Sequence, residues 1–107
     1  MRIAITARHQ DISPDLRTRA RALVLRLAKL AARAHDAQVI FASDHRVATV
    51  ELKLHILRGA ILVGRAEGAD HRSALDLAAA RVRRQLDKLP VKRRRSRARR
   101  AVGREAS

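Results

Sequence analysis

The chain of 107 residues contains no cysteine, no tryptophan and no tyrosine, and Phe41 is its one phenylalanine. The absence of cysteine excludes a disulfide scaffold and a thiolate metal site, and it fits a reducing compartment. With so few aromatic rings, the hydrophobic core must be built from leucine, isoleucine, valine and alanine. The same scarcity disfavours binding of single-stranded nucleic acid by base stacking, which needs aromatic platforms.

Long apolar runs are also missing. The N-terminal stretch Met1–Thr6 lacks the extended apolar core of a signal peptide, and no later run approaches the roughly 20 residues of a membrane span. We therefore expect a protein without a membrane segment that stays in the cytoplasm. The four glycines are scattered, so the sequence has no glycine-rich loop of the kind that binds nucleotide phosphates.

Acidic residues are few compared with basic ones. Lysine and arginine number 25 against 10 aspartates and glutamates, which gives a formal net charge of +15. Part of the excess lies in Val91–Ser107, with eight basic residues and one acid, but residues 1–90 are basic as well. Such a surface attracts polyanions by displacing their counterions. A genome-wide bias toward arginine and alanine is the alternative explanation, and the clustering of the charges argues against it.

The stretch Asp70–Leu89 is predicted to form an amphipathic helix. Its apolar residues recur at steps of three and four, which places them on one side of a helix that turns about 100° per residue. They are Leu75, Ala78, Ala79, Val82, Leu86 and Leu89. Asp70 can cap the helix and Pro90 ends it. The basic residues Arg81, Arg84 and Lys88 follow the same spacing and form a second stripe on the flank.

A second amphipathic helix is predicted from Pro14 to about Ala34. Ser13 is suited to cap it, and Pro14 is suited to its first position. Its apolar stripe consists of Leu16, Ala20, Leu23, Val24, Leu27, Leu30, Ala31 and Ala34. The basic residues Arg19, Arg26, Lys29 and Arg33 cluster on one flank, while Arg17 and Arg21 lie on the other. Residues 17–33 contain no acid, whereas an ordinary solvated face mixes charges of both signs.

Four short apolar or alternating segments are predicted to be strands: Arg2–Thr6, Ala37–Ser43, Val47–Ile56 and Ile61–Ala66. The fold class is therefore α+β, with the order β-α-β-β-β-α. A right-handed crossover makes the first two strands parallel, and two hairpins complete a four-stranded mixed sheet. Both helices follow strands that run the same way. They should lie roughly parallel on one face of the sheet, with their basic flanks pointing the same way.

Residues suited to catalysis or metal binding do not form a recognisable site. The five histidines lie on different elements, without a metal-ligand spacing: His9, His35, His45, His55 and His71. Asp44 and His45 are adjacent, but neighbouring residues in a turn normally point apart. Neither Ser43 nor Ser73 lies in a nucleophile motif. We therefore predict a protein that is not an enzyme and has neither a metal nor a cofactor.

The two basic flanks are the candidate nucleic-acid site. Charged helices on one side of a sheet resemble the way in which double-stranded-RNA modules contact phosphates and read shape. The predicted contacts are Arg19, Arg26, Lys29, Arg33, Arg81, Arg84 and Lys88. We expect a domain over residues 1–90 and a disordered tail over residues 91–107, where Arg93, Arg94 and Arg95 would add auxiliary contacts. An ordinary solvated surface is the alternative for both flanks.

Two parts of the sequence resemble the ribosome hibernation-promoting factor family, also called ribosome-associated inhibitors or the sigma-54 modulation family. The first is Ile5–His9 followed by Ser13–Arg17, which is similar to an opening I-T-G-R-H before a capped helix that begins T-x-x-L-R. The second is Ala66–Asp70 with Ala74–Asp76 and Arg84–Lys88, which is similar to a helix A-E-x-x-D-M-Y-A-A-I-D that ends in R-Q-L.

The resemblance implies a domain that binds the small ribosomal subunit and its ribosomal RNA in the channel used by messenger and transfer RNA, and that silences idle ribosomes in stationary phase or under stress. Arg26, Arg81, Arg84 and Lys88 fall at positions that are typically basic in the family. It also implies a short form, monomeric off the ribosome, that would need a companion hibernation factor to pair ribosomes. The alternatives are a basic RNA- or DNA-binding module without a ribosomal site, and a protein that binds acidic partners through its tail.

Overall fold

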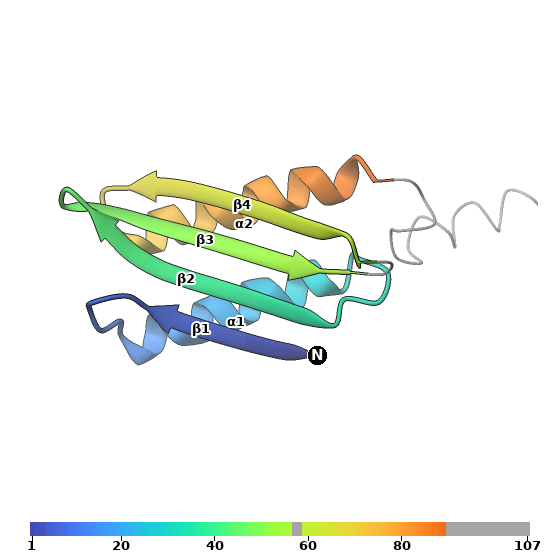
Figure 1. Ribbon diagram of the computed structural model, residues 1–107, viewed down its shortest axis with the longest axis horizontal. Helices are drawn as coiled ribbons and strands as arrows, with labels where there is room; N and C mark the ends of the chain where they lie inside the picture. The colour runs from blue at the N-terminus through green and yellow to red at the C-terminus, as the bar shows by residue number, and fades with distance from the viewer. Residues whose placement is uncertain (57–58, 90–107) are drawn as a thin grey trace, which may run out of the picture.

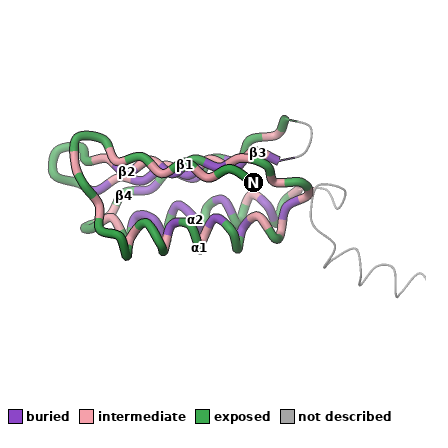
Figure 2. The backbone as a smooth tube through the Cα atoms, turned by 90° about the horizontal axis from the view of Figure 1, so that it is seen from below, coloured by how far each residue is buried: buried purple, intermediate pink, exposed green. Residues whose placement is uncertain are grey.

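The computed structural model describes residues 1–56 and 59–89, which form a four-stranded sheet with two helices on one side (Figures 1 and 2). The elements in chain order are β1 (Arg2–Ala7), α1 (Pro14–Ala28), β2 (Asp36–Asp44), β3 (Val47–His55), β4 (Ile61–Gly68) and α2 (His71–Asp87). The predicted α+β class and the order β-α-β-β-β-α are confirmed. The predicted tail, with Arg93, Arg94 and Arg95, lies outside the described residues.

The sheet places its strands side by side in the order β1-β2-β3-β4. β1 pairs with β2 in parallel, with Ile5 opposite Val39, and both remaining pairs are antiparallel. β1 and β4 therefore run the same way, and the helix that follows each strand returns behind the sheet in the opposite direction. Figure 1 shows α1 and α2 roughly parallel, as predicted.

The core lies between the helices and the face of the sheet that they cover, where Figure 2 shows the buried segments. β3 alternates, with Val50, Leu52 and Leu54 buried and the residues between them partly exposed. Phe41 on β2 is fully buried. Helix α2 contributes Ala74, Leu75, Ala78, Ala79, Val82 and Leu86. The predicted stripe of α2 is thus confirmed, except that Leu89 is only partly buried.

Both helices begin at the caps that the sequence predicts. The Ser13 hydroxyl accepts a hydrogen bond of 3.1 Å from the backbone N–H of Leu16, and Pro14 occupies the first turn of α1. The Asp70 carboxylate accepts one of 2.7 Å from the N–H of Ser73 at the start of α2. This bond stabilises the ionised form and lowers the pKa of Asp70.

The first helix is shorter than predicted, because α1 ends at Ala28 and not near Ala34. The backbone then tightens, since the N–H groups of Leu30 and Ala31 bond to carbonyl groups only three residues back. Arg33 adopts a positive φ of 53°, which no helical residue has. The chain must cross from the helix layer to the sheet before β2 begins beside β1, so it has to leave the helix early.

Helix α2 lies very close to β4 because Gly64 carries no side chain. A Cβ atom at this position would come within 2.3 Å of the carbonyl oxygen of Ala78, and within 2.9 Å of a methyl group of Val82. The turn between β3 and β4 contains Gly59 with a φ of 74°, a backbone conformation that glycine adopts without a steric cost. No helix in the described part of the chain is long and apolar enough to cross a membrane.

Candidate nucleic-acid interface

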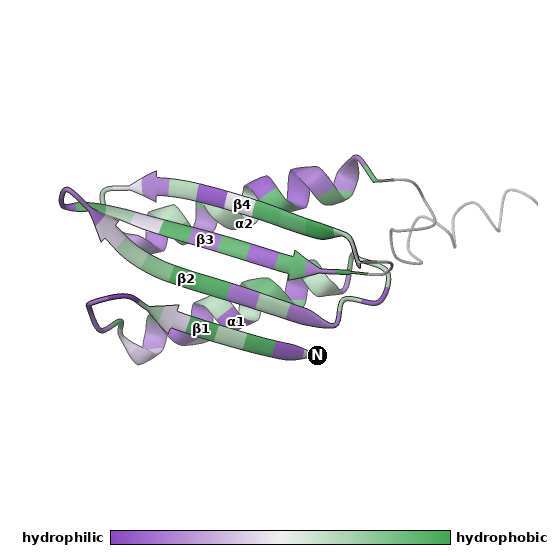
Figure 3. Cartoon of the chain, viewed as in Figure 1, coloured by the Kyte–Doolittle hydropathy of each residue, from purple (hydrophilic) through white to green (hydrophobic). Residues whose placement is uncertain are grey.

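Positive charge is concentrated in the helix layer of the fold. Residues 14–35 carry six basic residues and one acid, and residues 70–89 carry five basic residues and three acids. The four strands together carry three basic residues and four acids. Figure 3 shows hydrophilic stretches recurring along both helices. Among the described residues, the exposed side of this layer, which we call the helix face, is therefore the surface best suited to a polyanion.

Arg19 does not belong to the free charges of the helix face. Its Nε and Nη2 donate hydrogen bonds of 2.8 Å each to the two carboxylate oxygens of Asp76 on α2. The side chains are 37% and 42% exposed. The hydrogen bonds to Asp76 raise the pKa of the Arg19 guanidinium. The predicted phosphate contact Arg19 thus links the two helices, and its charge is largely balanced.

Arg81 lies at the edge of the sheet, along β4. Its Nη1 donates a hydrogen bond to the backbone carbonyl of Arg65. Its side chain remains exposed, so its other N–H groups can still reach a phosphate. Arg83, four residues before Asp87, pairs with that acid at 3.3 Å.

The remaining predicted contacts form one group near the C-terminal ends of both helices. We call them the terminal cations: Arg26, Lys29, Arg33, Arg84 and Lys88. All five are exposed, and within residues 1–56 and 59–89 none makes an ion pair. Because the helices are parallel, these charges lie toward the same end of the helix face (Figure 1). Arg33 reaches this end from the turn after α1, not from the helix on which it was predicted.

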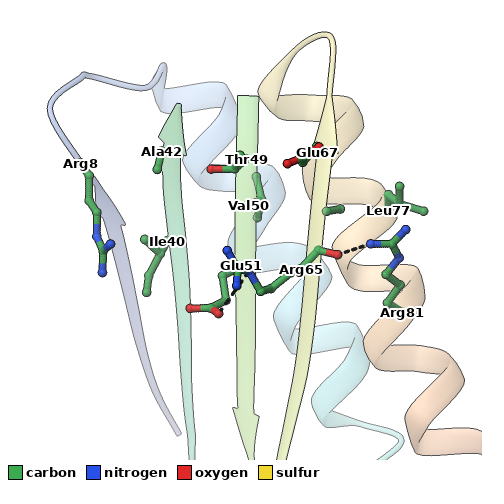
Figure 4. Close-up of a pocket in the computed structure, with 11 residues that line it drawn as sticks. Arg8, Ile40, Ala42, Thr49, Val50, Glu51, Arg65, Glu67, Leu77 and Arg81 are labelled. Atoms are coloured by element: carbon green, nitrogen blue, oxygen red, sulfur yellow. Dashed lines mark hydrogen bonds and ion pairs between the residues drawn. The ribbon is translucent and has the colours of Figure 1, made fainter. Parts of the chain in front are cut away.

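A shallow hollow of about 470 Å³ lies on the uncovered face of the sheet and extends over β4 toward α2 (Figure 4). Its lining combines three basic residues, Arg8, Arg65 and Arg81, with the acidic residues Glu51 and Glu67. Glu51 pairs with Arg65 at 3.7 Å and with Lys53 at 3.8 Å. With charges of both signs in one place, this surface is poorly suited to phosphate.

The five histidines lie at several places in the fold. His45 Nε2 is 3.4 Å from Asp44 Oδ1, so the expectation from the sequence that these two neighbours point apart is wrong. His71 lies 2.8 Å from the carbonyl oxygen of Ala42 through Nε2, and its ring packs edge-on against Phe41 with centroids 5.7 Å apart. It therefore ties the start of α2 to β2. His35 and His55 are 6.0 Å apart between ring centroids. In the described part of the chain, no group of three or more histidines and acids could hold a metal ion.

Comparison with known families tests the resemblance found in the sequence. Residues 3–94 match the family model described as Sigma 54 modulation protein / S30EA ribosomal protein. The chain belongs to this family. It is a family of ribosome-associated proteins, and the resemblance found in the sequence is confirmed.

Two solved structures share the fold. A ribosomal subunit interface protein from Coxiella burnetii is 24% identical, with a TM-score of 0.71, over 82% of this chain and 96% of the other. The N-terminal domain of Protein Y from Thermus thermophilus is 23% identical, with a TM-score of 0.69, over 80% of this chain and 96% of the other. A search of curated protein sequences finds no match.

Proposed function

We propose that this protein is a non-enzymatic inhibitor of translation that binds the small ribosomal subunit in the channel of messenger and transfer RNA. The observation that carries the proposal is the set of five exposed terminal cations on one end of the helix face. Family membership supplies the ribosome as the partner. The names of the two structural relatives, a subunit interface protein and Protein Y, fit the same assignment.

The mechanism is occupancy. Arginine and lysine side chains on two braced helices meet phosphates of ribosomal RNA without reading bases, and binding releases condensed counterions. The Arg19–Asp76 pair holds α1 and α2 together, so the charges that they carry keep a fixed spacing. While the domain occupies the channel, messenger and transfer RNA cannot enter. No bond is made or broken, and no cofactor is needed.

We expect the protein to act in the cytoplasm as a monomer when it is off the ribosome, in stationary phase or under stress. Pairing of ribosomes, if it accompanies silencing, would then require a companion factor. The tail would add affinity through nonspecific contacts, since Arg93, Arg94 and Arg95 lie among eight basic residues in Val91–Ser107.

The proposal is tested by co-sedimentation of the purified full chain with 30S subunits across a range of salt concentrations. The double variant Arg84→Glu/Lys88→Glu should bind at least tenfold more weakly and reduce the slope of log affinity against log salt by about 2, one unit per lost phosphate contact. A matched control, Arg17→Glu/Arg21→Glu, makes the same change of charge on the opposite flank of α1 and should bind nearly as the parent does.

Two further measurements separate this proposal from a general nucleic-acid-binding module. Binding of 30S subunits should resist a large excess of duplex RNA or DNA, and messenger RNA bound beforehand should exclude the protein. Equal affinity for naked duplexes and subunits would contradict a ribosomal site. Deletion of Val91–Ser107 should weaken binding and flatten its salt dependence while competition with messenger RNA persists.

A further inference from the structure

The two outer edges of the sheet, on β4 and on β1, differ in whether side chains bond to their backbone. At the β4 edge, the N–H of Val63 donates to Oε1 of Gln85 at 3.2 Å, and Nε2 of Gln85 donates to the carbonyl of Val63 at 2.6 Å. The carbonyl of Arg65 accepts from Arg81. Side chains of α2 thus take the place that a further strand would occupy, which protects this edge from pairing.

Within residues 1–56 and 59–89, the β1 edge has no such cover. The backbone N–H groups of Arg2 and Arg8 donate toward the β2 side, at 3.3 and 2.8 Å. Because peptide groups alternate in direction along a strand, those of Ile3, Ile5 and Ala7 point outward. Among the described residues, no side chain bonds to them. β1 forms the lower boundary of the sheet in Figure 1, and no strand of the described residues lies on its outer side.

The hydrophobic core is also incomplete at this edge. On β4, the inward side chains of Leu62 and Ala66 are buried, with 7% and 4% of their surface exposed. On β1, the inward side chains of Ile3 and Ile5 are only partly buried. A segment paired with β1 would cover them and extend the core by one strand.

The flank of α1 next to β1 indicates which charge such a segment should carry. Arg19 on α1 points toward α2, where it bonds Asp76. At about 100° per residue, Arg17 and Arg21 each lie roughly 160° around the helix from Arg19, and so face away from α2, on the β1 side. Both are exposed, and neither makes an ion pair within the described residues. Inward side chains of an added strand would meet these two arginines.

We propose that the outer edge of β1 is a docking site for an extended acidic peptide segment of another protein, which pairs as a fifth strand. Main-chain hydrogen bonds to Ile3, Ile5 and Ala7 would give affinity, and acids facing Arg17 and Arg21 would give specificity.

A second copy of this chain is a poor occupant. Two-fold pairing of β1 with β1 would bring the same arginine flanks of both copies together, and like charges repel. The site lies on the flank of α1 opposite the terminal cations, so it is independent of ribosome binding.

The test uses the full chain without ribosomes and a capped ten-residue peptide of alternating glutamate and valine. Amide hydrogen exchange followed by NMR should show that saturating peptide slows exchange at Ile3, Ile5 and Ala7. The amides of Ala4 and Thr6 already face β2 and should not change. This alternation is the signature of strand addition, and binding at some distant charged surface would not produce it.

Two comparisons assign the specificity. Arg17→Glu/Arg21→Glu should lower the affinity for the glutamate–valine peptide about tenfold. The matched variant Arg84→Glu/Lys88→Glu changes residues away from the β1 edge and should leave this affinity unchanged. A lysine–valine peptide should bind the parent protein at least as weakly as the glutamate–valine peptide binds Arg17→Glu/Arg21→Glu. The proposal is overturned if the lysine peptide binds equally well, if protection appears at Val63 instead, or if millimolar peptide protects none of the three amides. Self-association of the parent chain with protected β1 amides would equally overturn it in favour of a second copy.

Discussion

Arg19 on α1 and Asp76 on α2, 57 residues apart in sequence, form a two-pronged ion pair in which both hydrogen bonds measure 2.8 Å. The planar guanidinium matches the carboxylate, so the pair fixes how the helices are rotated as well as their separation. The carboxylate of Asp76 also balances one positive charge of the helix face. The pair therefore shapes the proposed RNA surface without being one of its free cations.

A double-mutant cycle measures this link. Arg19→Ala, Asp76→Ala and the double variant should give a coupling of about 0.5–1 kcal/mol in the free energy of unfolding, kept small because both side chains are more than a third exposed. Urea denaturation provides the measurement. The cycle for Arg83 and Asp87, a single-bond pair within one helix, should give less, about 0.3–0.5 kcal/mol. A coupling near zero for Arg19 and Asp76 would mean that the bond does not hold the helices.

The fold could be predicted from the sequence wherever the determinants are local. Ser13 and Asp70 are caps that act within three residues, and the spacing of Leu75, Val82 and Leu86 defines the buried side of α2 without reference to any other element. The order of strands then limits the directions in which two helices can run. These inferences needed only the periodicity of helices and strands.

What could not be predicted depends on contacts between distant segments. The pairing of Arg19 with Asp76 leaves no spacing signal, whereas Arg83 and Asp87 are four residues apart and could have been paired from sequence. α1 ends at Ala28 because the chain must reach the start of β2. The apolar spacing typical of a helix continues beyond Ala28, so the sequence alone does not show this end. The turn at His45 and Arg46 could be predicted, but its backbone geometry could not. Both residues adopt a positive φ, and the asparagine or glycine that usually marks such a turn is missing.

Gly64→Ala should destabilise the protein, because the new methyl group would collide with the backbone carbonyl of Ala78, which cannot rotate away. Helix α2 would have to shift from β4, at a cost of about 1–3 kcal/mol in the free energy of unfolding. Gly59→Ala is the control. It meets no neighbouring atom, and its positive φ should cost only about 1 kcal/mol. Equal losses for the two variants would contradict the close approach of α2 to β4.

Asp70 should make stability depend on pH in the acidic range. Folding lowers its pKa, so its contribution is fully present above the ordinary value of 3.8 and is lost as the pH falls through the lower folded pKa. Asp70→Asn keeps a capping oxygen but cannot titrate. The difference in unfolding free energy between the parent and this variant should therefore shrink between about pH 5 and pH 2. A constant difference over that range would show that the charge of the cap contributes nothing.

Gln85 should protect the backbone of β4 from exchange with solvent. Its amide satisfies both the N–H and the carbonyl of Val63, so Gln85→Ala leaves that peptide group facing water at an open edge. Loss of a bond that contributes about 1 kcal/mol should speed amide exchange at Val63 roughly fivefold, with smaller changes on β3. Gln10→Ala, which removes an exposed bond to Ser43, is the matched control and should leave Val63 unaffected. Unchanged exchange in Gln85→Ala would mean that α2 does not seal this edge, and the contrast between the two edges of the sheet would disappear.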